Sequence, residues 1–156
     1  MAPSPTNSWL AFDIGGANIK AADGQGWSHS EPFAMWQEWK RLPDAIRHIQ
    51  SLRPARHHAV TMTGEIADCF SERSDGVRHI VQSCCLATGT NNVFFYSVAG
   101  VFVTAKEAIH HPLDVAASNW HALARLAGSL TPSGNSWLID IGSTTTDIVP
   151  ISSGKP

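Results

Sequence analysis

A short apolar run followed by Asp-Ile-Gly occurs twice in this chain, once near each end. The first copy is Trp-Leu-Ala-Phe-Asp-Ile-Gly-Gly-Ala-Asn-Ile-Lys at residues 9–20, and the second is Trp-Leu-Ile-Asp-Ile-Gly-Ser-Thr-Thr-Thr-Asp-Ile at residues 137–148. In each copy an apolar strand ends in an acidic residue, small residues form a turn, and a second strand returns. The repeat therefore predicts two strand-turn-strand units of the same design.

The two predicted turns have a composition that suits phosphate binding. Turns of Gly, Ser and Thr bring backbone N–H groups close to phosphate oxygens, and the hydroxyl groups add further donors. Loop 1 comprises Gly15, Gly16, Ala17 and Asn18, and loop 2 comprises Gly142, Ser143, Thr144 and Thr145. We expect both loops to hold a phosphate-bearing ligand between them.

An aspartate ends the first strand of each unit, Asp13 in one and Asp140 in the other. A carboxylate beside phosphate is unfavourable alone, but it can hold Mg²⁺, which then bridges to the phosphate oxygens. We therefore predict that Asp13 and Asp140 are catalytic residues and metal ligands. A single Asp-Ile-Gly-Gly sequence is more often an ordinary hairpin turn, and it is the repetition that favours the phosphate interpretation.

Three further residues admit more than one interpretation. Glu65 follows a predicted strand and Gly64, where α/β folds often place catalytic groups, so it is a candidate base; a carboxylate that only favours a helix dipole is the alternative. Asp147 either bonds the backbone of the second turn or takes part in catalysis. Lys20 is interpreted as a solvated strand residue.

Hydrophobic periodicity and turn residues predict an α/β fold. Strands are predicted at 9–12, 18–22, 26–29, 59–63, 92–97 and 101–104, with a final hairpin at 137–141 and 146–151. Helices are predicted at 33–52, divided at Pro43, at 67–86, interrupted near Asp75 and Gly76, and from Asp114 to Ala127 with Gly128 as the stop.

Composition excludes several classes of partner. The formal net charge is -2 with a pI of about 6.4 and no run of like charges, so neither nucleic acid nor a membrane surface is expected. Cys69, Cys84 and Cys85 form no Cys-x-x-Cys pair, and no secretory leader is recognised, which favours the cytoplasm. The eight histidines show no zinc-ligand spacing, and Trp36, Trp39 and Trp120 are assigned to packing.

The paired sequences 13–20 and 140–147 resemble the two phosphate loops of the actin-like ATPase superfamily. Together with Met-Thr-Gly-Glu-Ile-Ala-Asp-Cys-Phe at 62–70 and Ala-Ser-Asn-Trp-His-Ala-Leu-Ala at 117–124, the whole chain resembles the N-terminal part of the hydantoinase/oxoprolinase-related proteins of tetrahydromethanopterin-linked one-carbon metabolism. Archaeal members of that group include a methanofuran-pathway synthase that joins an aminomethylfuran diphosphate to a tyramine derivative and releases diphosphate.

This resemblance implies an actin-like, ribonuclease H-like lobe with a five-stranded mixed sheet flanked by helices, followed by the first hairpin of a second lobe. The expected division is a flexible tail at 1–7, a first lobe with loop 1 at 8–130, and the start of a second lobe with loop 2 at 131–156. Family members continue for a second lobe of similar size, so a further segment or an oligomeric partner would complete the cleft.

The implied function is a diphosphate-eliminating transferase of one-carbon cofactor biosynthesis, acting on a small phosphorylated substrate with Mg²⁺. Two alternatives stay open. One is an ATP-dependent hydrolase or kinase of the same superfamily, because its loops would look alike. The other is a nucleotide-binding module without catalysis.

Overall fold

Strand β1 (Asn7–Ile14) lies within a six-stranded mixed sheet in the computed structural model, which describes residues 7–142 and 146–156. The order of the strands is β3-β2-β1-β4-β5-β6. Strands β1, β4 and β5 run parallel, and the other neighbouring pairs are antiparallel. The remaining strands are β2 (Asn18–Ala22), β3 (Ser28–Pro32), β4 (Ala55–Met62), β5 (Val93–Tyr96) and β6 (Phe102–Thr104). This is the mixed α/β sheet expected for an actin-like lobe.

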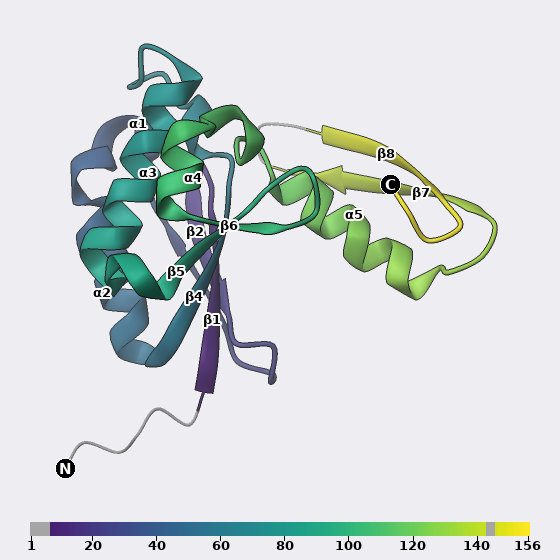
Figure 1. Ribbon diagram of the computed structural model, residues 1–156, viewed down its shortest axis with the longest axis horizontal. Coiled ribbons are helices and arrows are strands. Elements are labelled where there is room, and N and C mark those ends of the chain that lie inside the picture. Colours follow the sequence, from purple (N-terminus) through teal and green to yellow (C-terminus); the bar gives the residue numbers. More distant parts are fainter. Residues whose placement is uncertain (1–6, 143–145) are drawn as a thin grey trace.

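Four helices cover one face of this sheet (Figure 1). They are α1 (Met35–Glu38), α2 (Leu42–Leu52), α3 (Arg73–Thr88) and α4 (Ala105–His110). Short 3-10 turns join the elements: η1 (Trp39–Arg41), η2 (Gly64–Ile66), η3 (Thr90–Asn92) and η4 (Pro112–Asp114). None of the helices in the described part of the chain is long and apolar enough to cross a bilayer.

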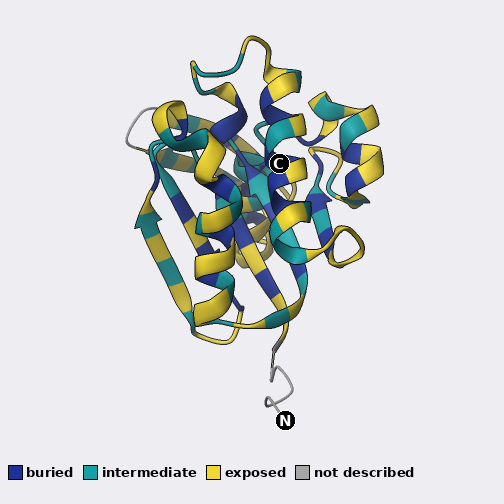
Figure 2. Cartoon of the chain, turned by 90° about the vertical axis from the view of Figure 1, so that its left-hand side faces the viewer, coloured by how far each residue is buried: buried dark blue, intermediate teal, exposed yellow. Residues whose placement is uncertain are grey.

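The core lies between these helices and the sheet. Alternate residues of β1, Leu10, Phe12 and Ile14, are buried, as the period of a strand requires. They belong to one hydrophobic cluster with Ile46 of α2 and Val77 of α3, which recur at helical spacing with their neighbours. Figure 2 shows these helices with buried inner residues and exposed outer ones. Burial of these apolar residues is the main force that holds the helices on the sheet.

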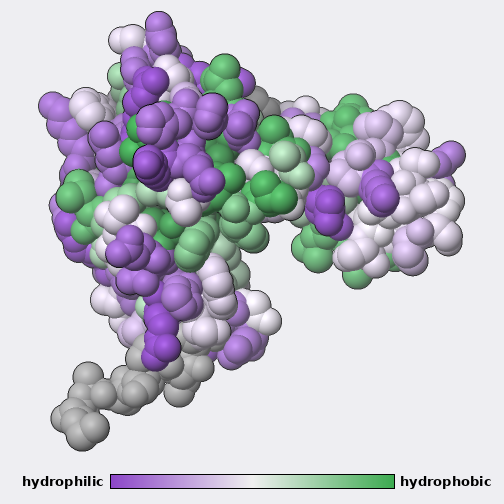
Figure 3. Space-filling model, viewed as in Figure 1, coloured by the Kyte–Doolittle hydropathy of each residue, from purple (hydrophilic) through white to green (hydrophobic). Residues whose placement is uncertain are grey.

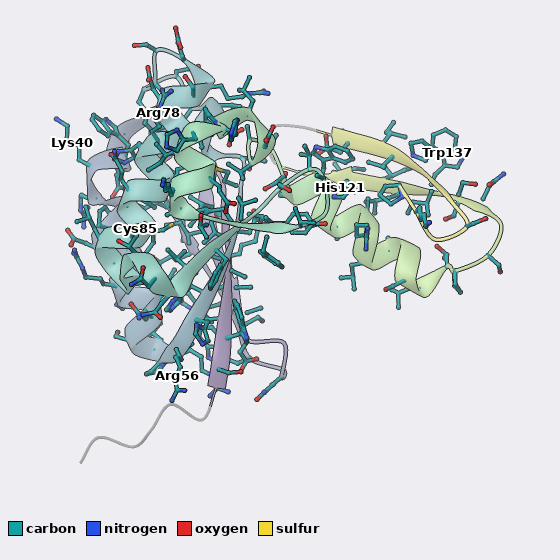
Figure 4. The ribbon with its side chains drawn as sticks, in the orientation of Figure 1. Lys40, Arg56, Arg78, Cys85, His121 and Trp137 are labelled. Atoms are coloured by element: carbon teal, nitrogen blue, oxygen red, sulfur yellow. The ribbon has the colours of Figure 1, made fainter. Side chains whose placement is uncertain are left out.

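The opposite face of the sheet is open and carries small, polar and aromatic side chains. Ala11 and Asp13 alternate on β1, and Ala59 and Thr61 lie on β4; all four line a cavity of about 730 Å³ that α5 partly covers. The hydroxyl of Tyr96 and Nδ1 of His121 are 3.0 Å apart and join α5 to this side of the sheet, as Figure 4 shows for His121. We call this space the sheet-face cavity.

A separate two-stranded sheet follows α5 (Asn119–Leu130) and projects from the main body (Figure 1). Its strands are β7 (Asn135–Ile141) and β8 (Thr146–Ser152). Val149 and Ile151 are buried in this unit. A Cβ atom at Gly128 would overlap the backbone of Gly154, so glycine permits the close contact between α5 and the turn after β8.

The structure corrects the predicted number of strands in the sheet and three of the predicted elements. The strand predicted at 101–104 is present as β6 and pairs with β5, so the sheet has six strands rather than five. The helix predicted at 67–86 begins only at Arg73 and continues through Gly76 without a break. Asp114 does not cap α5; it ends η4, and the helix runs from Asn119 to Leu130, past Gly128. The third strand lies at Ser28–Pro32 rather than 26–29.

Pro43 behaves as predicted. It lies in the first turn of α2, where its missing N–H breaks no helical hydrogen bond. The apolar pattern at 33–52 is thereby divided into α1, η1 and α2.

Candidate functional site

The middle of loop 1, Gly16 and Ala17, is held through its carbonyl groups rather than its N–H groups. The carbonyl oxygens of Gly16 and Ala17 accept hydrogen bonds of 2.9 Å from the N–H groups of Met35 and Phe33. The N–H groups of Gly16 and Ala17 donate to no acceptor in the described part of the chain. Backbone N–H groups without a protein acceptor are available to donate to an anion, the role that the sequence predicts for this loop.

The glycines of loop 1 fulfil two different requirements. The N–H of Gly15 donates to the carbonyl of Asn18 at 3.0 Å, and a Cβ atom at Gly15 would lie 2.9 Å from that same oxygen, so the tight turn requires glycine there. A Cβ atom at Gly16 would have no neighbour within 4 Å. Gly16 therefore borders open space, where an anion can approach the backbone.

Asp13 is the penultimate residue of β1, separated from loop 1 only by Ile14, and it has only weak partners. Its carboxylate oxygens lie 3.4 Å from Lys20 Nζ and 3.4 Å from Thr61 Oγ1. The side chain is 29% exposed and borders the sheet-face cavity. Lys20 is 62% exposed, in agreement with a solvated lysine, although it also pairs with Asp13. A carboxylate with two long contacts and access to solvent fits a ligand for a hydrated cation.

The second hairpin carries two aspartates on one face. Asp140 on β7 and Asp147 on β8 are directly opposed partners in the antiparallel ladder, so their side chains point to the same side. Both are partly buried. Like charges in this arrangement repel each other, and a bound cation would remove that repulsion. The described residues contain no cluster of three or more metal-ligating side chains, so a cation held by this pair or by Asp13 stays a prediction.

A cavity of about 320 Å³ brings the two loop regions together. Gly16 and Ala17 of loop 1 line it on one side, and Asp147 of β8 lines it on another. We call this space the inter-loop cavity. Gly142 is exposed at the end of β7, and Ser143, Thr144 and Thr145 of loop 2 lie outside the described residues. Asp13 and Asp140 do not line the inter-loop cavity itself.

Glu65 lies in η2 and is buried, with 1% of its surface exposed. Its Oε1 accepts a hydrogen bond of 2.8 Å from the N–H of Ala117 and lies 4.0 Å from Nε of Arg73. Its Oε2 has no hydrogen-bond partner among the described residues. Burial raises the pKa of the Glu65 carboxyl, and the Ala117 amide opposes that shift only in part. Glu65 does not line the inter-loop cavity, so its role as a base stays a prediction.

Sequence reasoning missed much of the cavity wall. Trp36, Asp68, Asn119 and Trp120 all line the inter-loop cavity. Trp39 does pack in the interior, with its ring centroid 4.9 Å from that of His79, but Trp36 is 50% exposed. The helical spacing of Trp36 and Trp39 suggested that both serve packing. Only the structure shows that Trp36, on α1, lines the cavity beside loop 1.

Comparison with known proteins places the chain in a family. Residues 56–156, more than half of the chain, match the family model described as hydantoinase/oxoprolinase. The chain belongs to the hydantoinase/oxoprolinase family. The relationship predicted from the two loop sequences together with the segments at 62–70 and 117–124 is therefore confirmed. The matched region of the family contains Glu65, the Ala117 segment and the second hairpin, whereas loop 1 precedes it.

A characterised relative extends the similarity to loop 1. The chain is 37% identical over 145 residues to the (4-{4-[2-(gamma-L-glutamylamino)ethyl]phenoxymethyl}furan-2-yl)methanamine synthase of Methanocaldococcus jannaschii. The alignment covers 91% of this chain and 43% of the relative, so this chain spans less than half of that protein's length. Within the hydantoinase/oxoprolinase family, the similarity to this relative thus extends over most of this chain.

Proposed function

We propose that this chain forms the phosphate-binding half of a diphosphate-eliminating transferase in the biosynthesis of a methanofuran-type cofactor. The observation that carries the proposal is the inter-loop cavity. It is lined by Asp147 of the second hairpin and by Gly16 and Ala17, whose N–H groups have no acceptor in the described part of the chain. The product named for the M. jannaschii relative supports the choice of chemistry, since it contains a phenoxymethyl group on a furan ring.

The proposed reaction forms an ether between a phenol and a furan methylene carbon. The phenolic oxygen forms a bond to this carbon while the bond from the carbon to a diphosphate oxygen breaks. The electron pair of that bond leaves with diphosphate, and the phenolic proton passes to a base or to solvent. Negative charge therefore develops on the leaving diphosphate, where preorganised donors accelerate the reaction.

The residues of the chain fit the needs of such a leaving group. The amides of loop 1 would donate to the diphosphate oxygens, and Asp13 and Asp140 would hold Mg²⁺, which supplies further positive charge to the departing group. Trp36 and Trp120 on the cavity wall offer flat apolar surfaces for aromatic rings. Asp147, opposite Asp140, is a candidate third carboxylate for the same cation.

Calorimetric titration of the chain with diphosphate and Mg²⁺ tests the proposal. We expect binding that requires Mg²⁺, and we expect Asp13→Asn and Asp140→Asn each to weaken it by about tenfold or more, the usual effect of losing a charged contact. Asp75→Asn is the matched control, because Asp75 is an exposed carboxylate on α3 that pairs with Arg78. This control should bind as the unaltered chain does.

The same titration with ATP separates the alternatives. Binding of diphosphate without binding of ATP supports the transferase, whereas tight binding of ATP that also depends on Asp13 and Asp140 favours an ATP-dependent hydrolase or kinase. Absence of binding to either ligand by the folded chain would overturn the phosphate-binding site itself. A nucleotide-binding module without catalysis would bind ATP but show no turnover when the complete protein is assayed.

A further inference from the structure

We infer that Glu65 is a positioning residue that holds the backbone at Ala117 and thereby fixes the wall of the inter-loop cavity formed by Asn119 and Trp120. The inference rests on the proposed function, since it treats that cavity as the ligand site. It also gives Glu65 a role other than that of the catalytic base.

The first observation is the hydrogen bond between two distant parts of the chain. Oε1 of Glu65 accepts from the N–H of Ala117 at 2.8 Å, across 52 residues of sequence. The acceptor is a carboxylate that is almost completely buried. A buried hydrogen bond in surroundings of low dielectric constant is stronger than one exposed to water, so it can hold a backbone segment in place.

The second observation is the backbone conformation that this bond holds. Ala117 has φ of 48°, in the left-handed region that residues with a Cβ atom rarely adopt. For such a residue, the left-handed conformation is populated roughly tenfold less than the ordinary right-handed or extended conformations. The turn therefore needs support from outside, and the Glu65 carboxylate supplies it.

The third observation concerns the residues directly after Ala117 in the chain. Ser118 is fully buried, and Asn119 and Trp120, in the first turn of α5, line the inter-loop cavity. The direction in which the chain leaves Ala117 sets the position of this first turn. Releasing Ala117 would therefore move the cavity wall.

Glu65, at the other end of this hydrogen bond, lies in η2, which packs directly against loop 1. A Cβ atom at Gly64 would lie 2.9 Å from the carbonyl oxygen of Gly15, and a Cβ atom at Gly76 would overlap the backbone of Glu65. Glycine at both positions allows η2 to pack directly between loop 1 and α3. Glu65 thus connects loop 1 to the cavity wall at Asn119 and Trp120, through the close approach of Gly64 to Gly15 and through its own side-chain hydrogen bond to Ala117.

Replacement of Glu65 separates positioning from proton transfer. Glu65→Ala removes the acceptor, Glu65→Gln keeps an acceptor oxygen but cannot act as a base, and Glu65→Leu fills the space without an acceptor. In the double variant Glu65→Ala/Ala117→Gly, glycine adopts the left-handed conformation without help. Glu72→Ala, at an exposed glutamate before α3, is the control.

Two measurements on these variants test the inference: amide hydrogen exchange at residues 117–120, and the dissociation constant for diphosphate with Mg²⁺. In Glu65→Ala and Glu65→Leu we expect these amides to exchange about tenfold faster and diphosphate to bind about tenfold more weakly. Glu65→Gln should stay within about threefold of the unaltered chain in both measurements. The double variant should regain most of the affinity for diphosphate that Glu65→Ala loses.

Three results would overturn the inference. They are a Glu65→Gln variant as impaired as Glu65→Ala, a double variant without recovery, or unchanged exchange at residues 117–120 in both Glu65→Ala and Glu65→Leu. The exchange measurement does not depend on the ligand. If diphosphate does not bind but the exchange pattern is as expected, the proposed function fails while the positioning of Ala117 by Glu65 is supported.

Discussion

Buried polar side chains in this fold differ in how many hydrogen-bond partners they have. Asp23 accepts hydrogen bonds from the N–H groups of Gln25 at 2.7 Å and Trp27 at 3.1 Å, and it pairs with Arg53. The Gln25 amide, with help from Arg53, lowers the pKa of Asp23, so this carboxylate stabilises the fold at neutral pH. His58 is the opposite case. The residue is 1% exposed, and neither ring nitrogen has a hydrogen-bond partner of normal geometry among the described residues.

His58 should make the stability of the chain depend on pH. Burial lowers the pKa of His58 below its ordinary value, and a backbone group of Asn92 offsets this only in part. The unfolded chain therefore binds this proton more readily, and stability falls as the pH drops through about 6.5. As the pH falls from about 7.5 to about 5.5, the free energy of unfolding of His58→Leu, measured in urea, should rise by about 1 kcal/mol relative to that of the unaltered chain.

The control for this prediction is His110→Leu, because His110 is exposed. Its stability should follow that of the unaltered chain over the same pH range. A parallel pH dependence of His58→Leu and the unaltered chain would contradict the prediction.

At the scale of elements, the position of a glycine within α3 shows what local pattern misses. Gly76, preceded by Asp75, suggested an interruption, because glycine favours turns and weakens helices. The structure has an unbroken helix there, and Gly76 is buried against the backbone of Glu65. The glycine is present because η2 and α3 approach too closely for a side chain. Tertiary packing therefore overrides its low helix propensity.

Gly76→Ala gives a prediction whose sign depends on this contact. Helix propensity alone favours alanine by about 1 kcal/mol. A Cβ atom at this position overlaps backbone rather than a movable side chain, so we expect a net loss of about 1–3 kcal/mol in the free energy of unfolding, measured in urea. Gln82→Ala, at an exposed position of the same helix, should change stability by less than about 0.5 kcal/mol. A Gly76→Ala variant that is more stable than the unaltered chain would contradict the prediction and show that η2 and α3 can move apart.

At the scale of the whole molecule, the β7–β8 hairpin has one covered and one exposed face. Trp137, Ile139 and Ile141 alternate on β7, and Ile148 lies opposite Ile139 on β8. Their exposed fractions are 68%, 59%, 77% and 62%. Hydrophobic residues are visible on this part of the surface in Figure 3, and Trp137 is labelled in Figure 4. A contiguous apolar face on an isolated pair of strands favours association.

This face should control self-association of the chain in solution. Ile139→Lys combined with Ile148→Lys should weaken any self-association by about tenfold or more, since each isoleucine contributes on the order of 1 kcal/mol when buried. Sedimentation velocity over a series of concentrations measures the effect. Leu113→Lys, at an exposed leucine in η4, should leave association unchanged. Equal association of both variants would contradict the prediction.

The sequence by itself determined the α/β class, the repeated strand-turn-strand units and the family, because these depend on local periodicity, on turn residues and on short motifs. It indicated Asp13, Asp140 and the two loops as site residues for the same reason. Only the tertiary structure decided that β6 joins the sheet, that α5 begins at Asn119, and that Asp147, Trp36 and Trp120 share a cavity with loop 1. The burial of Glu65 against Ala117 could not be read from either segment, because the contact joins residues that are distant in the chain and leaves no periodic signal in either.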